Sequence, residues 1–209
     1  MVSREDAGVK SEIWLVRHGP TEWSGAGRHT SRTDAKLTEA GRAAAAALAP
    51  LLADHDFDLV LASPASRALE TARLAGFEAC EIAPDLHEWN YGDVEGLTTA
   101  QIRGRGPEWA HWTVWTGPLA NGETIDDVAA RARRIIARAD ASTGDVLLFG
   151  HGHQLRILAA VAVDLEPGAG ARLALDAASV SVIGREHDQR VLRLWNFRPG
   201  IASAPRPRA

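Results

Sequence analysis

Residues 13–21 read Ile13-Trp14-Leu15-Val16-Arg17-His18-Gly19-Pro20-Thr21, a short apolar run that ends in an arginine, a histidine and a glycine. The run has the length and the apolar character of a buried strand. In open α/β sheets, ligands bind at the carboxyl ends of the strands, which is where Arg17 and His18 would then lie. An arginine there suits an anionic ligand, and a histidine can act as a nucleophile or a base. The alternative is a strand whose last two polar residues simply reach solvent.

The overall composition is that of a globular protein. The chain has 209 residues, of which 45% are hydrophobic and 24% charged, and its formal net charge is −4. A chain of this length can bury a substantial core, and we expect a single domain over residues 1–198. The slightly acidic balance gives no reason to expect nucleic acid or a membrane surface as a partner.

We expect neither a secretory signal nor a membrane span. Residues 1–12 are polar and lack the apolar stretch of a secretory signal, and the most apolar segment, residues 155–163, is too short for a membrane span. We therefore expect a cytoplasmic protein. Residues 199–209 are rich in proline, alanine and arginine and are predicted to form a disordered tail. The single cysteine, Cys80, excludes an intrachain disulfide.

Segments with strand character alternate with segments of helical periodicity through most of the chain. Strands are predicted at residues 59–62, 77–83, 145–149, 178–183 and 190–195, the last two as a hairpin. Helices are predicted at residues 38–52, 64–75, 124–139 and 154–163, with Thr38, Ser63 and Thr124 as caps, and loops at residues 21–33 and 85–97. This alternation is typical of an α/β fold, and we expect a three-layer α/β/α sandwich with a mostly parallel central sheet.

A second predicted strand ends in the same way as the first. Residues 145–149 run into a glycine and His151, so His18 and His151 would meet at one edge of the sheet if the two strands are neighbours. The strand at residues 59–62 is followed by a helix that carries Arg67 in its first turn. The dipole of that helix also favours an anion.

Residues 98–120 are predicted to form a short, lid-like insertion. Trp109, Trp112 and Trp115 are spaced by three within it, which is typical of one face of a short helix that packs on the body of the protein. The alternative is a lid whose aromatic face overhangs a pocket. The spacing alone favours packing.

Five segments together resemble the histidine phosphatase superfamily, the phosphoglycerate mutase-like proteins. They are the Arg17-His18-Gly19 signature in residues 15–23, the arginine helix of residues 63–72, the acid loop of residues 86–96, the helix start Gly122-Glu123-Thr124, and Gly150-His151-Gly152. One such motif is weak evidence, but five in order at compatible spacing are strong. Residues 22–24 and 27–34 look closest to a subgroup that includes actinobacterial acid phosphatases and fungal sedoheptulose bisphosphatases.

The resemblance implies a role for each residue at this edge of the sheet. His18 would be the nucleophile that becomes phosphorylated, and Glu88 would donate a proton to the leaving group. Arg17, Arg67 and His151 would hold the phosphoryl oxygens. Because the arginines would balance the charge of these oxygens, we expect no metal ion and no cofactor. An acidic pH optimum is expected, since Glu88 must be protonated while His18 stays neutral.

Further contacts to the substrate or its phosphate are expected from Thr21, Ser24, Thr30, Ser31 and Gly152. Ser24 stands where many relatives have asparagine, and His153 stands where many have glycine. We expect His153 to cap the following helix rather than to donate into the pocket. A zinc pair formed by His151 and His153 is disfavoured, because no third ligand is evident.

These features predict a metal-independent phosphatase acting on small phosphate monoesters such as sugar phosphates. The alternative is a cofactor-dependent phosphoglycerate mutase, but the short insertion and the disordered tail favour hydrolysis over retention of the phosphoryl group. A non-catalytic, phosphate-binding regulatory protein is a remote alternative, since such a protein would be expected to lack one of the five catalytic residues. The expected partner is a small phosphate ester, and a homodimer is a possible assembly. Arg103 and Arg105 are candidates for contact with a second phosphate.

Overall fold

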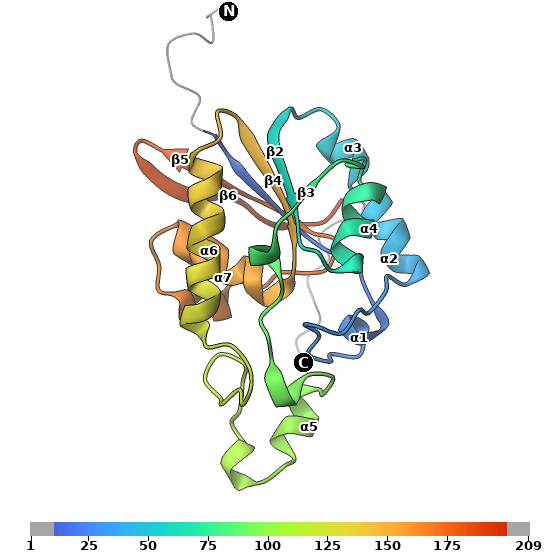
Figure 1. The fold of residues 1–209 in the computed structure, drawn as a ribbon, viewed down its shortest axis with the longest axis vertical. Coiled ribbons are helices and arrows are strands. Elements are labelled where there is room, and N and C mark those ends of the chain that lie inside the picture. Colours follow the sequence, from blue (N-terminus) through green and yellow to red (C-terminus); the bar gives the residue numbers. More distant parts are fainter. Residues whose placement is uncertain (1–10, 200–209) are drawn as a thin grey trace, which may run out of the picture.

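The computed structural model describes residues 11–199 (Figure 1). Except for Pro199, the predicted disordered tail lies outside the described residues, as do residues 1–10 of the polar amino-terminal segment. Between residues 11 and 199, no helix combines the length and the apolar character needed to cross a membrane.

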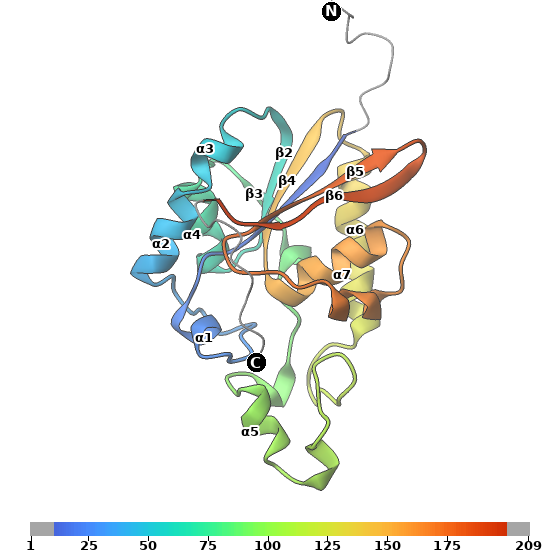
Figure 2. The same cartoon turned by 180° about the vertical axis from the view of Figure 1, so that it is seen from behind.

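A six-stranded sheet forms the centre of the molecule, with the strand order β3-β2-β4-β1-β5-β6 (Figure 2). The strands are β1 (Ile13–Arg17), β2 (Phe57–Ala62), β3 (Glu81–Ile82), β4 (Asp145–Gly150), β5 (Val180–Glu186) and β6 (Gln189–Phe197). The first four strands run parallel, whereas β5 is antiparallel to β1 and forms a hairpin with β6. The predictions of a mostly parallel sheet and of a hairpin formed by the last two strands are confirmed.

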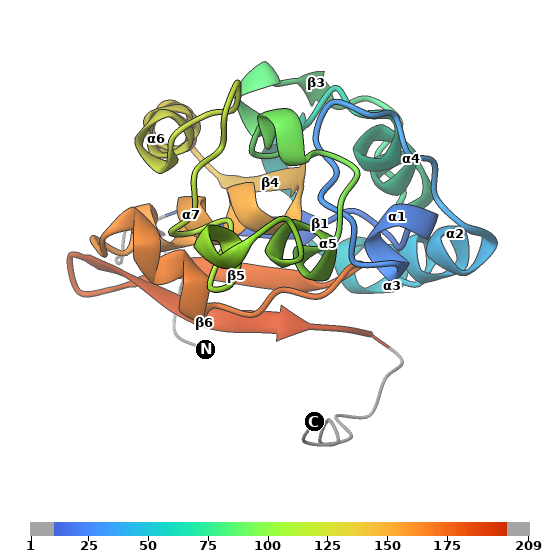
Figure 3. The ribbon, with the colours of Figure 1, turned by 90° about the horizontal axis from the view of Figure 1, so that it is seen from below.

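Helices cover both faces of the sheet, which confirms the predicted α/β/α sandwich (Figure 3). One face carries α2 (Glu39–Ala46), α3 (Ala49–Leu52) and α4 (Ser66–Leu74), and the other carries α6 (Ile125–Asp140) and α7 (Gly152–Ala162). Trp14 and Val16 of β1 pack with the first group, whereas Ile13 and Leu15 pack with the second. Because both faces are buried, β1 is a continuous apolar run rather than an alternating one.

Some predicted helix boundaries are wrong for local reasons. The helix predicted at residues 38–52 is two helices, since Pro50 at the start of α3 has no N–H to continue the hydrogen-bond ladder. Ala65 is the N-cap of α4, so Ser63 does not cap that helix. A short helix, α1 (Glu22–Gly25), interrupts the predicted loop at residues 21–33.

The insertion of residues 98–120 lies beyond the carboxyl ends of the parallel strands (Figures 1 and 2). It begins with α5 (Thr99–Arg103) and continues through a 3₁₀ turn at Pro107–Trp109. Trp112 is buried and Trp115 is partly buried in one apolar cluster with Trp89, Tyr91 and Ile157 of the body. The tryptophans therefore pack against the body, as their spacing favoured, although they do not share one helix.

Candidate active site

β1 and β4 bring the two histidines together. Arg17 pairs with Gly150 in the parallel register, so His18 and His151 leave adjacent strands at the same edge. Their ring centroids lie 5.1 Å apart, and the backbone N–H of His18 donates to the carbonyl of Gly150. The two histidines therefore meet at one edge of the sheet, as the sequence predicted for neighbouring strands.

The hydrogen bonding of His18 defines its protonation state. Its Nδ1 lies 2.7 Å from the carbonyl oxygen of Gly19, which can only accept, so Nδ1 carries the proton and Nε2 holds the lone pair. Burial, followed by the charges of Arg17 and Arg67, holds the pKa of His18 well below its ordinary value. The ring is therefore neutral at neutral pH, as a nucleophile must be.

A close backbone approach and a pair of hydrogen bonds fix the turn after His18. A Cβ on Gly19 would lie 2.5 Å from the carbonyl oxygen of Gly41 in α2, so only glycine fits there. The N–H of Gly19 donates to the hydroxyl of Thr71 at 3.0 Å, and this hydroxyl donates to the carbonyl of Arg67 at 2.7 Å. The backbone that carries His18 is thereby tied to both α2 and α4.

Arg17 and Arg67 supply two positive charges at this edge. Arg17 donates through Nη1 to the carbonyl of Leu175, and Arg67 donates through Nη1 and Nη2 to carbonyls of the loop at residues 30–33. Burial lowers the pKa of both groups, although the charge of Glu88 opposes that effect, and guanidinium groups remain cationic in proteins. The buried Nε of each arginine has no hydrogen-bond partner within residues 11–199.

His151 is fully buried at the N-cap position of α7. Its Nε2 lies 2.7 Å from the hydroxyl of Ser63, so this serine orients a histidine instead of capping a helix. Its Nδ1 is buried with no partner in the described part of the chain. Burial, followed by the charges of Arg67 and His18, holds the pKa of His151 well below its ordinary value and keeps the ring neutral.

The guanidinium of Arg17 packs against the start of α7 at Gly152, which has no side chain to displace it. A Cβ at this position would lie 3.2 Å from Cζ of Arg17, which is tighter than an ordinary contact. Three buried nitrogens without a described partner, Nε of Arg17, Nε of Arg67 and Nδ1 of His151, thus accompany the lone pair of His18. Buried polar groups are normally satisfied, and an anion is the ligand that would satisfy the two guanidinium groups.

Glu88 belongs to the acid loop of residues 86–96, and its carboxylate lies against the amino-terminal end of α7. Its Oε1 accepts from the N–H groups of Trp89 and Gln154 at 2.8 and 2.9 Å, and its Oε2 accepts from the N–H of His153 at 3.1 Å. Burial would raise the pKa of Glu88, but His153 and these three N–H groups outweigh burial and lower it. Because the pKa of His153 is itself lowered to about 4, the N–H groups dominate at neutral pH and hold Glu88 as a carboxylate.

A clamp on α6 holds the loop that carries Glu88. Arg131 pairs with Glu123 through two hydrogen bonds of 2.8 and 2.9 Å, and its Nη1 donates to the carbonyls of Asp85 and His87. The carboxylate of Glu123 also accepts from the N–H of Asn90. Glu123, in the segment Gly122-Glu123-Thr124, therefore helps to anchor the acid loop.

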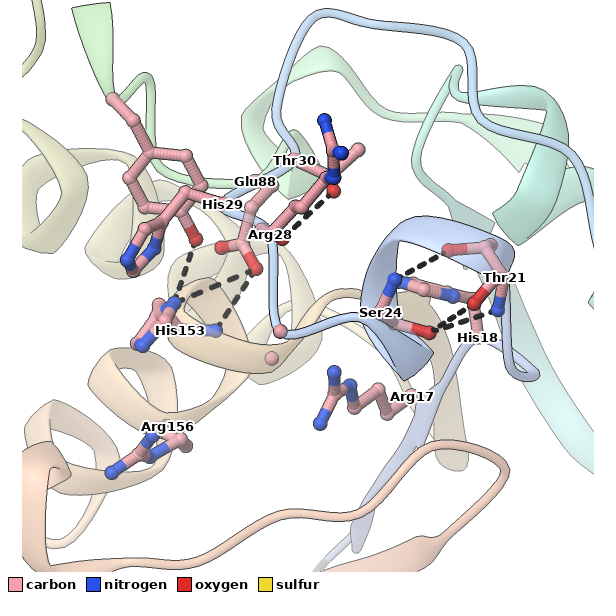
Figure 4. Close-up of a pocket in the computed structure, with 13 residues that line it drawn as sticks. Arg17, His18, Thr21, Ser24, Arg28, His29, Thr30, Glu88, His153 and Arg156 are labelled. Carbon is pink, nitrogen blue, oxygen red and sulfur yellow. Dashed lines mark hydrogen bonds and ion pairs between the residues drawn. The ribbon is translucent and has the colours of Figure 1, made fainter. Parts of the chain in front are cut away.

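A pocket of about 170 Å³ opens in front of Arg17, His18 and Glu88 (Figure 4). Of the predicted site residues, it is lined by Arg17, His18, Thr21, Ser24, Thr30, Glu88 and Gly152. Arg67 and His151 are not among its lining residues, and their exposed fractions are 1% and 0%. Its lining also includes His29, together with residues that the sequence did not assign to the pocket, namely Arg28, Tyr91, His153 and Arg156.

The predicted hydroxyl contacts are mostly engaged within the chain. Thr21 and Ser24 form a reciprocal cap on α1, and the hydroxyl of Ser24 donates to the carbonyl of Thr21. Thr30 donates to the carbonyl of Arg28, and Ser31 donates to the carbonyl of Glu88 from outside the pocket wall. Their roles toward a substrate stay predictions.

Two other expectations are wrong. His153 does not cap α7 with its side chain, which instead lies in the pocket beside Tyr91. Arg103 and Arg105 do not line the pocket, because they donate to the backbone of the insertion and the acid loop, at Trp112 and Asp93. Their side chains stabilise loops, and the sequence offered no signal for these backbone contacts.

Within residues 11–199, no group of three histidine, cysteine, aspartate or glutamate side chains is arranged to hold a metal ion.

Comparison with known proteins finds phosphatases that resemble this chain in sequence and in fold. An acid phosphatase of Mycobacterium tuberculosis is 40% identical over 205 residues, which cover 96% of this chain and 98% of that protein. Sedoheptulose 1,7-bisphosphatase of Saccharomyces cerevisiae is 31% identical over 177 residues, covering 70% of this chain and 65% of that protein. A solved structure of mycobacterial glucosyl-3-phosphoglycerate phosphatase covers 89% of this chain and 98% of its own, with a TM-score of 0.79 at 29% identity.

A solved structure of an open reading frame product of Mycobacterium tuberculosis aligns with a TM-score of 0.84 at 39% identity, covering 90% of this chain and 98% of that one. A profile of the histidine phosphatase superfamily (branch 1) matches residues 13–198. Since this match spans nearly the whole chain, the protein belongs to the histidine phosphatase superfamily.

Proposed function

We propose that this phosphatase hydrolyses small phosphate monoesters through a phosphohistidine intermediate on His18, without a metal ion. The observation that carries the proposal is the neutral His18, with a free lone pair on Nε2, beside three buried nitrogens that have no described partner. The relatives named acid phosphatase, sedoheptulose 1,7-bisphosphatase and glucosyl-3-phosphoglycerate phosphatase support a small, sugar-like ester as the substrate class.

In the first step, Nε2 of His18 attacks phosphorus and the bond to the ester oxygen breaks. The ester oxygen takes a proton from Glu88, since an alkoxide is a poor leaving group. Arg17 and Arg67 stabilise the negative charge on the transferring group, and His151 donates to one of its oxygens. The reaction needs no other source of positive charge in this scheme.

In the second step, water attacks the phosphoryl group on His18. The phosphorus–nitrogen bond breaks, the carboxylate of Glu88 takes the proton of the water, and inorganic phosphate leaves. Splitting one displacement into two in this way is the benefit of a covalent intermediate.

The proton on Glu88 has to arrive with the substrate, because the free carboxyl is ionised. A phosphate monoester has a second pKa of about 6, so its monoanion carries one proton into the pocket. This proton passes to Glu88 as the dianionic phosphoryl group settles between the two arginines. An acidic pH optimum follows from this step.

A phosphoglycerate mutase would run the same first step but return the phosphoryl group to substrate. That outcome requires a cover that excludes water from the phosphohistidine. The insertion of residues 98–120 is short, and its tryptophans pack into the body cluster rather than line the pocket. These observations support hydrolysis.

The proposal is tested with a panel of sugar monophosphates, sugar bisphosphates and 3-phosphoglycerate, with and without EDTA. We expect release of inorganic phosphate from sugar phosphates that EDTA does not reduce, and loss of at least about a thousandfold in His18→Ala. Formation of 2-phosphoglycerate primed by bisphosphoglycerate, with little free phosphate, would support the mutase. Loss of activity in EDTA, restored by a divalent cation, would contradict the metal-free scheme.

A further inference from the structure

Glu88 has two polar neighbours that the reaction scheme does not use. The hydroxyl of Tyr91 lies 2.6 Å from Nδ1 of His153. That Nδ1 lies 4.0 Å from Oε2 of Glu88, and Figure 4 shows His153 and Glu88 side by side. Tyr91 is almost fully buried and is the one tyrosine of the chain. The three groups form a compact cluster at one wall of the pocket.

Both neighbours can donate and accept hydrogen bonds. Burial, followed by the charge of Glu88, raises the pKa of Tyr91 well above its ordinary value, so the hydroxyl keeps its proton. Burial lowers the pKa of His153 to about 4, so the ring is neutral and carries its proton on one nitrogen only. The side chain of His153 is 21% exposed at the pocket, where it can exchange protons with water.

Two hydrogen-bond arrangements are therefore available. With the proton on Nδ1, His153 donates to the oxygen of Tyr91, and Tyr91 donates to the carboxylate of Glu88. With the proton on Nε2, the hydroxyl of Tyr91 donates to His153 instead, and the carboxylate has one donor fewer. The first arrangement stabilises ionised Glu88, and the second one favours its protonated form.

The geometry singles out Oε2 as the oxygen that carries the proton. Oε1 already accepts two backbone N–H groups, whereas Oε2 accepts only that of His153. A carboxylate oxygen has two lone pairs, so Oε2 keeps one for a proton or for the hydroxyl of Tyr91.

We propose that His153 is a positioning residue for this acid, holding the hydroxyl of Tyr91 so that it donates to Glu88 when Glu88 is ionised and turns away when Glu88 holds the proton. The change is a tautomer exchange of His153, in which one proton leaves Nδ1 and another binds Nε2, with no net charge moved. The inference rests on the proposed function, in which Glu88 is the proton donor.

Other charged and titratable groups face this cluster from several elements. They are Arg17 at the end of β1, His29 in the loop after α1, Arg67 in α4 and Arg156 in α7, and His18 lines the same pocket. The arginines stay cationic, and lowered pKa values keep His18 and His29 neutral near neutral pH. None of these groups is changed in the variants described below. A difference in pH profile between variants therefore reports on Tyr91 and His153.

The test uses substrates that differ in their need for an acid. p-Nitrophenyl phosphate has a stable leaving group and needs little protonation, whereas glycerol 1-phosphate leaves as an alkoxide unless it is protonated. The variants are His153→Phe, His153→Asn and Tyr91→Phe, and His111→Phe is the matched control because His111 is exposed on the insertion. Circular dichroism and thermal melting check that each variant folds.

We expect His153→Phe to lower kcat for glycerol 1-phosphate by about tenfold to a hundredfold and that for p-nitrophenyl phosphate by less than about threefold. In this variant, the alkaline limb of the pH profile of kcat with glycerol 1-phosphate shifts to lower pH, because Tyr91 then donates to the carboxylate of Glu88 permanently. Tyr91→Phe shifts this limb to higher pH. His153→Asn restores most of the rate, since its amide can donate to or accept from Tyr91.

Equal losses on the two substrates in His153→Phe, with unshifted pH profiles, would show a merely structural role and overturn the inference. The inference would also be overturned if the alkaline limb of the pH profile moved in the same direction in His153→Phe and in Tyr91→Phe. Glu88→Gln serves as the reference for the proposed function. If Glu88→Gln keeps the alkyl-to-aryl rate ratio of the wild type, Glu88 is not the acid and both claims fail. If it lowers that ratio but His153→Phe does not, only the inference fails.

Discussion

His18 is neutral and Glu88 is ionised in the free site, because the pKa of each group is lowered. In the proposed mechanism, His18 is therefore ready to attack at neutral pH, whereas Glu88 must gain a proton from the substrate monoanion. We expect kcat/KM for an alkyl phosphate to rise as the pH falls from about 8 to about 6. It falls again only at a more acidic pH, where His18 becomes protonated. A pH profile of kcat/KM measures both limbs, and a rate that still rises above neutral pH would argue against Glu88 as the acid.

Gly152 tests how closely Arg17 must approach the start of α7. An alanine there brings a Cβ to 3.2 Å from Cζ of Arg17, so the guanidinium has to shift by a few tenths of an ångström. We expect Gly152→Ala to lower kcat/KM by about tenfold, since small displacements of a phosphate-binding group are costly. Gly168→Ala is the control, because no atom lies within 4 Å of a Cβ built there. Equal kinetics for the two variants would show that Arg17 does not depend on this contact.

At the scale of elements, the clamp between α6 and the acid loop makes a separate prediction. Arg131 is 12% exposed and joins Glu123 to two loop carbonyls. We expect Arg131→Ala to lower the free energy of unfolding by about 1 to 3 kcal/mol, since it removes charge-assisted hydrogen bonds in a half-buried site. The rate with glycerol 1-phosphate should fall more than that with p-nitrophenyl phosphate, because Glu88 loses its support.

Arg134, one turn further along α6, provides the matched control. It pairs with Asp85 but is 57% exposed, so Arg134→Ala should change the free energy of unfolding by less than about 1 kcal/mol and leave kinetics intact. Urea unfolding and the two-substrate assay measure both effects. If the two variants behave alike, the clamp does not position the acid loop.

The elements themselves were largely predictable from the sequence. The sequence predicted that His18 and His151 follow two strands and would meet at one edge of the sheet if those strands were neighbours. The register shows that β1 and β4 are neighbours. The break at Pro50 was not predicted, although proline is the residue type that causes it. Ser63 was assigned to a helix cap because the pattern of serine before proline is local, whereas its contact with His151 spans 88 positions.

The states of the site residues were less predictable than their identities. Ionised Glu88 depends on N–H groups of α7, which only the fold brings to the acid loop. The side chain of His153 turns toward Tyr91, 62 positions away, so its place in the pocket had no sequence signal. Long-range contacts of this kind decide pKa values and tautomers, and no local pattern encodes them.

At the scale of the whole molecule, anion binding should stabilise the fold. A ligand that binds only the folded state at a hundred times its Kd adds about 2.7 kcal/mol, which raises the Tm of a chain of this size by about 5 to 10 °C. We expect orthovanadate or inorganic phosphate to produce this rise, and Arg67→Ala to abolish it. Sodium chloride at equal ionic strength is the control. No rise in the wild-type protein, or one that chloride matches, would contradict an anion site.

The central claim is that His18 carries the phosphoryl group, and chemical trapping tests it most directly. The enzyme is mixed with a ³²P-labelled substrate, quenched in alkali within milliseconds and analysed by peptide mapping, because phosphohistidine survives alkali and is lost in acid. The account predicts acid-labile label on the peptide that contains His18, formed and lost at rates compatible with turnover, and none in His18→Ala. Turnover without any trapped label, or label on another residue in both proteins, would contradict it.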